Sequence, residues 1–383
     1  MEWRIPLSDI DFGPEEEQAV LEVIRSRWLT MGAVTQGFEQ ELAEYAGVKH
    51  AIAVTNATAA LHLACVAAGL GPGDEAILPS LTFVATANAV RYTGARPVFA
   101  DVEGVDSLNI SPVAIEARIT PRTRAILVVH YGGYACDMPA ILEIARRHDL
   151  AVIEDAAHAI GSRLDGRMLG TWGAIGCYSF FSNKNMTTGE GGMLVTDDDR
   201  LAEKLRVLRS HGMTSLTWDR HKGHAWSYDV VDLGYNYRID EVRSAIGRVQ
   251  LRRLEANNQV RRERTALYHE LLQELCPAVG VPFQAHPGES ACHLLPVLLP
   301  GDVQRQAFME QMKQRGVQTS IHYPPIHQFS AYRGRDDGAA LDLAVTEDVT
   351  TRQVTLPLYP GMSEADVRCV VDAVRDALEV DVS

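Results

Sequence analysis

The sequence predicts an α/β fold, with a mostly parallel sheet in a large domain and a smaller α+β domain at the C-terminal end. Short apolar runs alternate with helix-sized amphipathic stretches over about residues 50–210. Strands of a parallel sheet are covered on both faces, so they are continuously apolar and do not alternate with polar residues. Beyond this region the pattern changes to one long stretch rich in Arg, Glu and Leu, followed by shorter elements.

The elements can be assigned in chain order from this pattern. A helix is expected at 14–27, followed by a turn region around Gly32 and Gly37. In the large domain, which we place at residues 1–250, we expect strands at 51–54, 75–78, 97–100, 125–130, 151–154, 175–180 and 192–195, and helices at 57–69, 82–93, 137–148 and 200–210. The domain boundary lies within a long helix at 239–275. The small domain, residues 251–383, then contains strands at 293–299 and 317–321 and helices at 302–315 and 364–378.

The composition excludes several classes of protein. The chain has 383 residues with 36 Lys and Arg against 50 Asp and Glu, which gives a net charge of −14. Such an acidic chain is unsuited to coating nucleic acid or an anionic membrane, so neither is expected as a partner. The six cysteines form no CxxC pair, and neither a signal peptide nor a membrane span is evident. We therefore expect reduced thiols in a cytoplasmic protein.

Three segments contain candidate functional residues, and the first follows the strand at 51–54. Small polar residues end this strand, and a helix begins at once with Ala57 and Thr58. The free N–H groups and the dipole of a helix N-terminus bind phosphate without any Lys or Arg. Simple capping of the helix by Asn56 or Thr58 explains the same residues.

The second segment places Asp155 at the end of the apolar strand 151–154. Ligands of α/β sheets bind at the carboxyl ends of the strands, where a carboxylate can pair with a protonated ring nitrogen. Alternatively, Asp155 caps the turn that follows.

The third segment contains Lys184, the only lysine between Arg122 and Lys204. It follows the strand at 175–180 and lies beside the glycine-rich turn 189–192. A lysine near a sheet edge with little solvent around it has a lowered pKa and acts as an amine nucleophile. The alternative is an ordinary surface lysine.

Taken together, the three segments supply the parts that hold pyridoxal phosphate (PLP). One anchors the phosphate, the acid keeps the pyridine nitrogen protonated, and the lysine binds the cofactor covalently and moves protons.

Other motifs do not indicate function. The glycines at 69–74 follow a helix, so they form a helix end and not a dinucleotide fingerprint. The paired histidines have no cysteine or carboxylate at ligand spacing, so no metal site is expected.

Seven ordered motifs also resemble the DegT/DnrJ/EryC1/StrS family of sugar aminotransferases. They lie at 56–61, 79–86, 154–158, 179–184, 189–192, 233–238 and 322–327. The resemblance extends over about residues 6–378 and implies a fold-type I PLP transferase that acts as a homodimer. It further implies that the amino group of L-glutamate is transferred to a keto-sugar nucleotide. Some relatives replace the lysine with histidine and remove a sugar hydroxyl, and Lys184 argues against that branch.

The resemblance also implies roles for individual residues. Lys184 would bind the cofactor covalently and Asp155 would pair with its ring nitrogen. Asn236 would reach the phosphate from the second subunit, and Arg238 would lie near the entering substrate. The other positions carried over are Phe83, which would stack on the ring, His158, which would lie under or beside it, Ala57, Thr58 and Ser179, which would hold the phosphate, and Thr30, Tyr323 and His327, which match segments that line the sugar site.

Two further expectations concern the sugar nucleotide. Its diphosphate needs local cations, for which Arg238, Lys222 and the histidines at 211–224 are candidates. The segment that begins with His130 is similar to relatives that aminate C4 of 4-keto-6-deoxy sugars. His130 would hydrogen-bond a sugar hydroxyl or the phenolic oxygen of the cofactor, unless it merely ends its strand.

We therefore expect a dTDP- or UDP-linked 4-keto-6-deoxyhexose as substrate, with dTDP-4-keto-6-deoxyglucose as the first choice and a 4-amino-4,6-dideoxyhexose as product. Amination of a 3-keto-sugar nucleotide, a cyclitol ketone or an aminobenzoate precursor is the alternative within the same chemistry. A non-catalytic PLP-binding regulator is the alternative outside it, although the intact lysine and the lack of a DNA-binding extension argue against a regulator.

Overall fold

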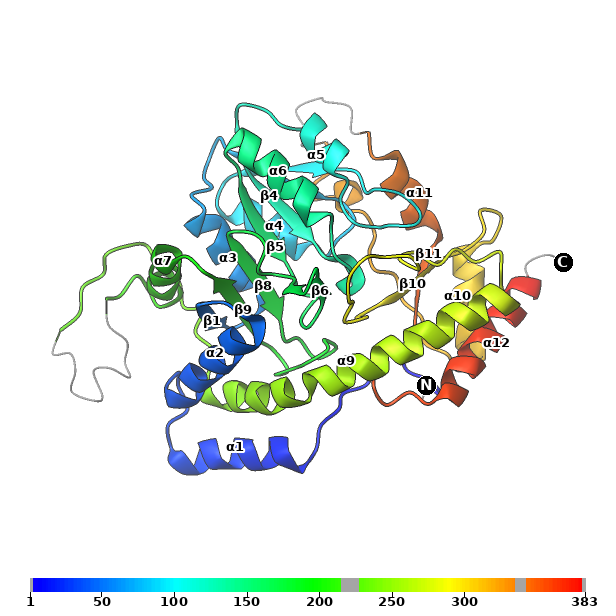
Figure 1. The fold of residues 1–383 in the computed structure, drawn as a ribbon, viewed down its shortest axis with the longest axis horizontal. Helices are drawn as coiled ribbons and strands as arrows, with labels where there is room; N and C mark the ends of the chain where they lie inside the picture. The colour runs from blue at the N-terminus through cyan, green and yellow to red at the C-terminus, as the bar shows by residue number, and fades with distance from the viewer. Residues whose placement is uncertain (1–2, 215–226, 335–341, 381–383) are drawn as a thin grey trace.

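The fold is built on a seven-stranded sheet that is covered by helices on both faces (Figure 1). The computed structural model describes residues 3–214, 227–334 and 342–380. The strand order is β1-β9-β8-β5-β4-β2-β3, and only β9 pairs in the antiparallel sense with its neighbours. The strands are β1 (His50–Val54), β2 (Glu75–Pro79), β3 (Arg96–Ala100), β4 (Thr123–Val129), β5 (Ala151–Asp155), β8 (Ile175–Ser179) and β9 (Gly192–Thr196). The predicted mostly parallel α/β sheet is confirmed.

Two apolar clusters lie on opposite faces of this sheet, because successive side chains of a strand point to opposite faces. The face that carries Ile52 and Ile153 is covered by α3, α4 and α7. The face that carries Ala53 and Val152 is covered by α2, α5, α6 and the first half of α9. These helices are α2 (Ala33–Ala46), α3 (Ala57–Ala67), α4 (Ala85–Tyr92), α5 (Pro112–Ala117), α6 (Met138–His148), α7 (Asp199–Arg209) and α9 (Glu241–Leu275).

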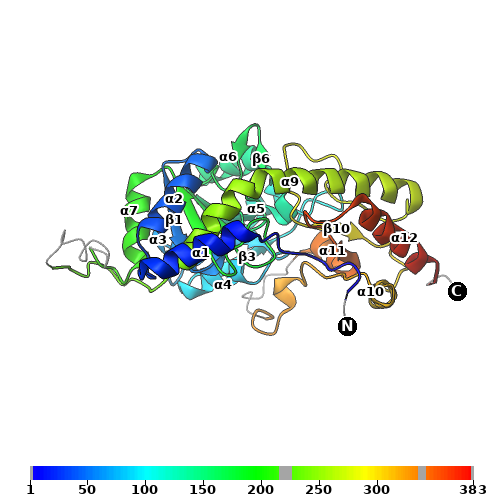
Figure 2. The same cartoon turned by 90° about the horizontal axis from the view of Figure 1, so that it is seen from below.

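The long helix α9 connects the large sheet to the smaller C-terminal part (Figures 1 and 2). Helix α1 (Pro14–Ser26) lies along its first half, and α12 (Glu364–Val380) packs on its second half. The division of the chain at residue 250 falls inside α9 and stays a prediction.

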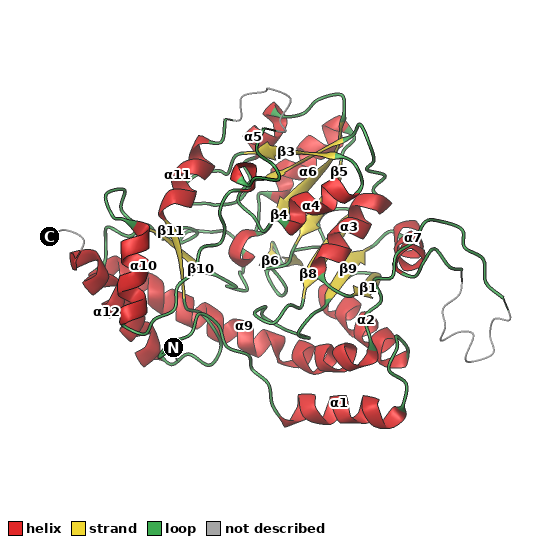
Figure 3. Cartoon of the chain, turned by 180° about the vertical axis from the view of Figure 1, so that it is seen from behind, coloured by secondary structure: helices red, strands yellow, loops and turns green. Residues whose placement is uncertain are grey.

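The smaller part has an apolar core of its own, which includes Tyr268, Val297 and Val371. Its helices lie beside a two-stranded sheet (Figure 3). The elements are β10 (Leu295–Leu298), α10 (Arg305–Gln314), α11 (Ala344–Arg352) and β11 (Gln353–Leu356), with short pieces elsewhere at η1 (Tyr131–Gly133), β6 (Arg163–Leu164), β7 (Arg167–Met168) and η2 (Ile326–Gln328). All six cysteines are free. No helix among residues 3–214, 227–334 and 342–380 is long and apolar enough to cross a membrane.

Two expected elements were wrong. The segment 317–321 makes only single bridges, Ile5 with Val317 and Ser320 with Thr355, and the strand that pairs with β10 is β11. The expected turn region at Gly32 and Gly37 is instead the start of helix α2. The Glu241 carboxylate of α9 accepts the N–H groups of Gly32, Val34 and Thr35, and so caps this helix from a position more than 200 residues away.

Candidate active site

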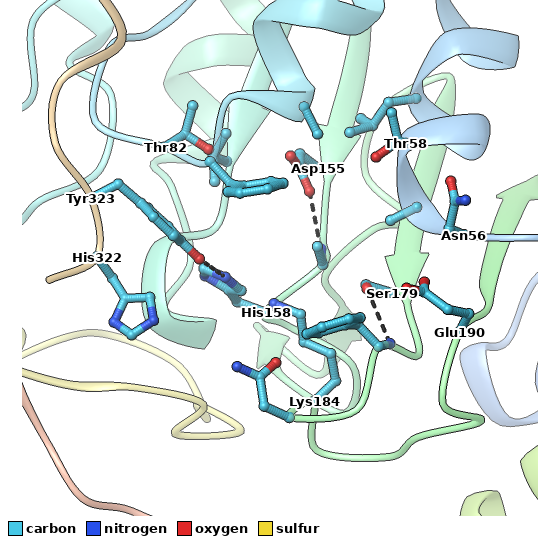
Figure 4. Close-up of a pocket in the computed structure, with 18 residues that line it drawn as sticks. Asn56, Thr58, Thr82, Asp155, His158, Ser179, Lys184, Glu190, His322 and Tyr323 are labelled. Atoms are coloured by element: carbon cyan, nitrogen blue, oxygen red, sulfur yellow. Dashed lines mark hydrogen bonds between the residues drawn. The ribbon is translucent and has the colours of Figure 1, made fainter. Parts of the chain in front are cut away.

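A cavity of about 390 Å³ opens at the carboxyl ends of β1, β5 and β8, where β9 begins (Figure 4). These ends meet because β1, β5 and β8 run in the same direction. The cavity is lined by Asn56, Ala57, Thr58, Leu61, Thr82, Phe83, Ala85, Val129, Asp155, Ala157, His158, Ser179, Phe181, Asn183, Lys184, Glu190, His322 and Tyr323.

One end of the cavity is the N-terminus of α3. The side chain of Asn56 caps this helix by accepting the N–H of Ala59 at 2.8 Å. The first N–H groups of the helix, at Ala57 and Thr58, have no partner within it and point out of its end. Ser179 adds a hydroxyl from the end of β8. The backbone at Gly192 passes so close that a Cβ there would lie 2.5 Å from the carbonyl carbon of Asn56. The result is a compact cradle for an anion.

Asp155 lies at the end of β5, where its carboxylate is nearly buried but reaches the cavity. The Thr86 hydroxyl donates to Oδ2 at 2.7 Å, and the N–H of Ala157 donates to Oδ1 at 3.2 Å. Burial raises the pKa of Asp155, and these two donors oppose the shift. A cationic ring nitrogen would therefore find a desolvated, oriented carboxylate at this point of the wall.

Lys184 extends from the loop after β8 into the same cavity (Figure 4). Burial lowers its pKa to about 8, and the charge of Asp155 opposes the shift. Near pH 8, Lys184 is then a neutral amine in a substantial fraction of the protein molecules. A nucleophile or a proton acceptor must be neutral in this way.

His158 and Tyr323 form a hydrogen-bonded pair that determines which proton faces the cavity. The N–H of Gly132 donates to His158 Nδ1 at 3.3 Å, so the ring proton lies on Nε2. Nε2 of His158 lies 3.1 Å from the Tyr323 hydroxyl oxygen and donates its proton to it. Burial and the nearby Lys184 hold the pKa of His158 well below its usual range, so the ring is neutral. The hydroxyl proton of Tyr323 remains available to a ligand.

Phe83 forms an exposed apolar edge of the cavity. Its side chain is 55% exposed, and its ring lies 5.8 Å from the ring of Tyr323. An exposed aromatic ring at a cavity mouth is suited to stacking on a planar ligand.

Seven of the sequence-predicted site residues besides Phe83 line this cavity. They are Ala57, Thr58, Asp155, His158, Ser179, Lys184 and Tyr323.

Four other predicted site residues lie outside it. Thr30 and Asn236 are exposed, and Arg238 is partly buried on the segment that leads into α9. His327 bonds Ser80 at 2.8 Å and Glu347 at 3.3 Å. Lys222 lies outside the described residues.

The expected role of His130 was wrong. We expected it to contact the sugar or the cofactor, but its side chain is 0% exposed and does not line the cavity. Its Nε2 bonds the Glu154 carboxylate at 2.9 Å, and its Nδ1 accepts the N–H of Cys136. Both ring nitrogens are therefore engaged inside the protein, and His130 supports the strand ends without reaching a ligand.

Of the residues in this region that were not predicted as site residues, three make polar contacts that bear on the chemistry. Thr86 orients Asp155, and His322 lines the cavity with its Nδ1 bonded to Thr355 at 2.9 Å. His293 lies with its Nε2 3.4 Å from Nζ of Lys184. Thr86 and His322 fall within motifs noted in the sequence, whereas no spacing links His293 to a lysine more than 100 residues earlier.

The comparison with known proteins identifies the family. The model of the DegT/DnrJ/EryC1/StrS aminotransferase family matches residues 11–375. The chain belongs to this family. A DegT/DnrJ/EryC1/StrS aminotransferase depends on PLP, so the predicted cofactor and transaminase activity are confirmed.

Individual DegT/DnrJ/EryC1/StrS relatives match over nearly their whole length. The chain is 42% identical to the spore coat polysaccharide biosynthesis protein SpsC of Bacillus subtilis, over 98% of this chain and 97% of SpsC. The aminotransferase TlmJ from Streptoalloteichus hindustanus is 36% identical, with a TM-score of 0.90 over 99% of this chain and 100% of TlmJ. DesI, whose structure was solved in the presence of its TDP-sugar product, is 32% identical, with a TM-score of 0.88 over 100% of this chain and 94% of DesI.

Proposed function

We propose that this chain transfers the amino group of L-glutamate to a nucleotide-linked keto-sugar, with PLP bound in the cavity described above. The observation that carries the proposal is that a lysine with a pKa of about 8 and a buried carboxylate face one cavity. The other end of this cavity is the anion cradle at the N-terminus of α3. The sugar nucleotide as acceptor is supported by the similarity to DesI, which was solved with a TDP-sugar.

The residues that line the cavity fit the chemistry of PLP, because an anion cradle, a carboxylate and a lysine face one space. When bound, PLP supplies an electron-withdrawing ring that stabilises negative charge at the carbon bearing the amino group. Asp155 would hold the proton on the ring nitrogen, and Lys184 would bind the aldehyde carbon and carry protons to and from the substrate. The remaining contacts would be Phe83 stacked on the ring, His158 under or beside it, and Ala57, Thr58 and Ser179 around the phosphate.

The diphosphate of the substrate needs a cation that the acidic chain offers only locally. Arg238 is our candidate, since its Nη1 is buried and has no hydrogen-bond partner in the described part of the chain. Burial and the nearby Arg209 lower the pKa of Arg238, so an anionic ligand would relieve both effects.

We propose a dTDP- or UDP-linked 4-keto-6-deoxyhexose as the acceptor. The support is the resemblance of the segment that begins at His130, and not a contact by His130 itself, which is buried. The test is to incubate the protein, PLP and 15N-labelled glutamate separately with the 4-keto and 3-keto isomers. NMR should locate the nitrogen at C4 of a 4-amino-4,6-dideoxyhexose. Efficient turnover of only the 3-keto isomer would contradict the C4 assignment and leave the transferase function intact. Turnover of only a free cyclitol ketone or an aminobenzoate precursor would contradict the sugar nucleotide as substrate.

We also propose that two subunits share each active site. Asn236 lies outside the cavity of its own chain, and the neighbouring Val230, Val231 and Leu233 are 56%, 59% and 80% exposed. Such an exposed apolar patch is typical of a surface that a partner covers. In this arrangement Asn236 would reach the phosphate in the second subunit.

Complementation tests this arrangement. A heterodimer of a Lys184→Ala chain and an Asn236→Ala chain contains one site in which both groups are intact. We expect each variant alone to be impaired and the heterodimer to regain up to about half of the wild-type rate per dimer. A 1:1 mixture that pairs at random, in which half of the dimers are heterodimers, should regain up to about a quarter. If confirmed heterodimers regain nothing, Asn236 does not act across the dimer.

A further inference from the structure

A buried histidine of the smaller C-terminal part, His293, faces the amine of Lys184. His293 precedes β10 of the smaller part, and its side chain is only 5% exposed. Its Nε2 lies 3.4 Å from Nζ of Lys184. Its Nδ1 lies 2.9 Å from Oδ1 of Asn185, the residue next to the lysine. Which ring nitrogen carries the proton decides what His293 does to the lysine.

The side-chain amides of Asn185 and Asn258 determine which ring nitrogen of His293 carries the proton. Asn258 of α9 donates its Nδ2 to the carbonyl of Ile160 at 3.1 Å, so its Oδ1 accepts. Asn185 donates its Nδ2 to that Oδ1 at 2.8 Å and to the carbonyl of Ala291 at 2.7 Å. Because both contacts need a donor, Nδ2 of Asn185 cannot exchange places with its oxygen. The oxygen of Asn185 therefore faces His293.

The proton of His293 follows from this orientation. An amide oxygen only accepts hydrogen bonds, so Nδ1 of His293 must carry the proton and donate it to Asn185. In a neutral ring the lone pair is then on Nε2, which faces Nζ of Lys184. The chain of amides thus presents the lysine with an acceptor.

Burial and nearby charged groups keep the ring of His293 neutral. The facing groups are Lys184, His158, whose ring centre lies 4.6 Å away, His322 and Arg261. Burial is the main effect that disfavours a charged His293 ring. Arg261, and Lys184 when it is protonated, add repulsion, whereas burial keeps His158 and His322 themselves neutral. Together, burial and this repulsion hold the pKa of His293 well below its usual range.

We propose that His293 is a positioning residue whose neutral Nε2 accepts a hydrogen bond from Lys184 and holds its amine in place whenever the lysine is not attached to the cofactor. The proposal rests on the role of Lys184 in the proposed function. During the part of the reaction in which the amine is free, a long flexible side chain would otherwise leave the place where it must give and take a proton. Asn185 and Asn258 act through His293, since they set its tautomer.

The tautomer can be tested directly without turnover. The 15N NMR spectrum of the full chain, both cofactor-free and loaded with pyridoxamine 5′-phosphate, reports the proton on each histidine nitrogen. The His293 signals are assigned by their absence in His293→Gln. We expect a neutral ring at pH 7.5 with the proton on Nδ1. A proton on Nε2, or on both nitrogens, would overturn the proposal.

The effect on the lysine is tested with two substitutions. His293→Gln keeps a donor for Asn185 and an acceptor for Lys184, whereas His293→Leu keeps neither. The titration of Lys184 in the cofactor-free chain is measured by acetic anhydride labelling and peptide mass spectrometry. We expect His293→Leu to lower the midpoint from about 8 by about one pH unit, because the hydrogen bond favours the charged amine. His293→Gln should leave the midpoint near the wild-type value.

Turnover of glutamate with PLP should follow the same order. We expect a loss of about 100-fold in kcat for His293→Leu and of about threefold for His293→Gln. His286→Gln, a substitution at a half-buried histidine outside the cavity, is the matched control and should behave as wild type. An unchanged midpoint in His293→Leu, or equal damage in both His293 variants, would overturn the proposal. Failure to aminate any sugar would instead count against the proposed function, since labelling and NMR need no sugar.

Discussion

Lys184→Ala is expected to abolish turnover, with a loss of about 10⁴-fold or more, and to remove the visible absorbance of the lysine-bound cofactor. In the proposed function Lys184 is both the nucleophile that binds the cofactor and the group that moves the proton, so the substitution would remove two separate contributions to the rate. The cavity retains the anion cradle, so the variant should still bind PLP non-covalently. Steady-state assays with glutamate and absorbance spectra measure the two effects.

Lys313→Ala is the control for this substitution. Lys313 lies on α10, far from the cavity lining, with its side chain 44% exposed. We expect the control to keep both wild-type activity and absorbance. A Lys184→Ala protein that turned over within tenfold of wild type would show that another residue performs the chemistry.

Asp155→Asn is expected to keep most of the cofactor but to lose about 10²–10⁴-fold in rate. The neutral amide no longer stabilises a proton on the ring nitrogen, so the ring withdraws electrons less strongly. Asparagine has nearly the same shape, and the Thr86 hydroxyl can turn from donating to accepting. The fold should therefore persist, which the thermal unfolding midpoint checks.

The matched control for this charge removal is Asp149→Asn. Asp149 ends α6 in the left-handed conformation at φ 53°, which asparagine also adopts, and it is exposed. Wild-type-like turnover of Asp155→Asn would refute its role at the ring nitrogen. An equal loss in both variants would indicate a general effect of the substitution on the protein.

Much of the large sheet and the centre of the site could be predicted because the signals are local. The strands are buried on both faces and therefore appear as apolar runs, and Asp155 and Ser179 are the last residues of β5 and β8. Parallel strands bring these ends to one edge of the sheet. Residues at the carboxyl ends of strands could thus be grouped into one site from the sequence alone.

The parts that were missed depend on residues far apart in the sequence. Helix α2 is capped by Glu241, and His293 obtains its tautomer from Asn185 and Asn258. His130 lies at the carboxyl end of a strand, as Asp155 does, yet its side chain is buried and pairs with Glu154. Neither apolar periodicity nor a motif contains such pairings, because they arise only when the chain is packed.

In the proposed function the cofactor is bound covalently in this cavity at Lys184. Borohydride reduction of the PLP-loaded protein, followed by digestion and mass spectrometry, locates the modified lysine directly. We expect the peptide containing Lys184 to carry the reduced cofactor at close to one equivalent per chain. Modification of a different lysine, with the Lys184 peptide unmodified, would contradict it.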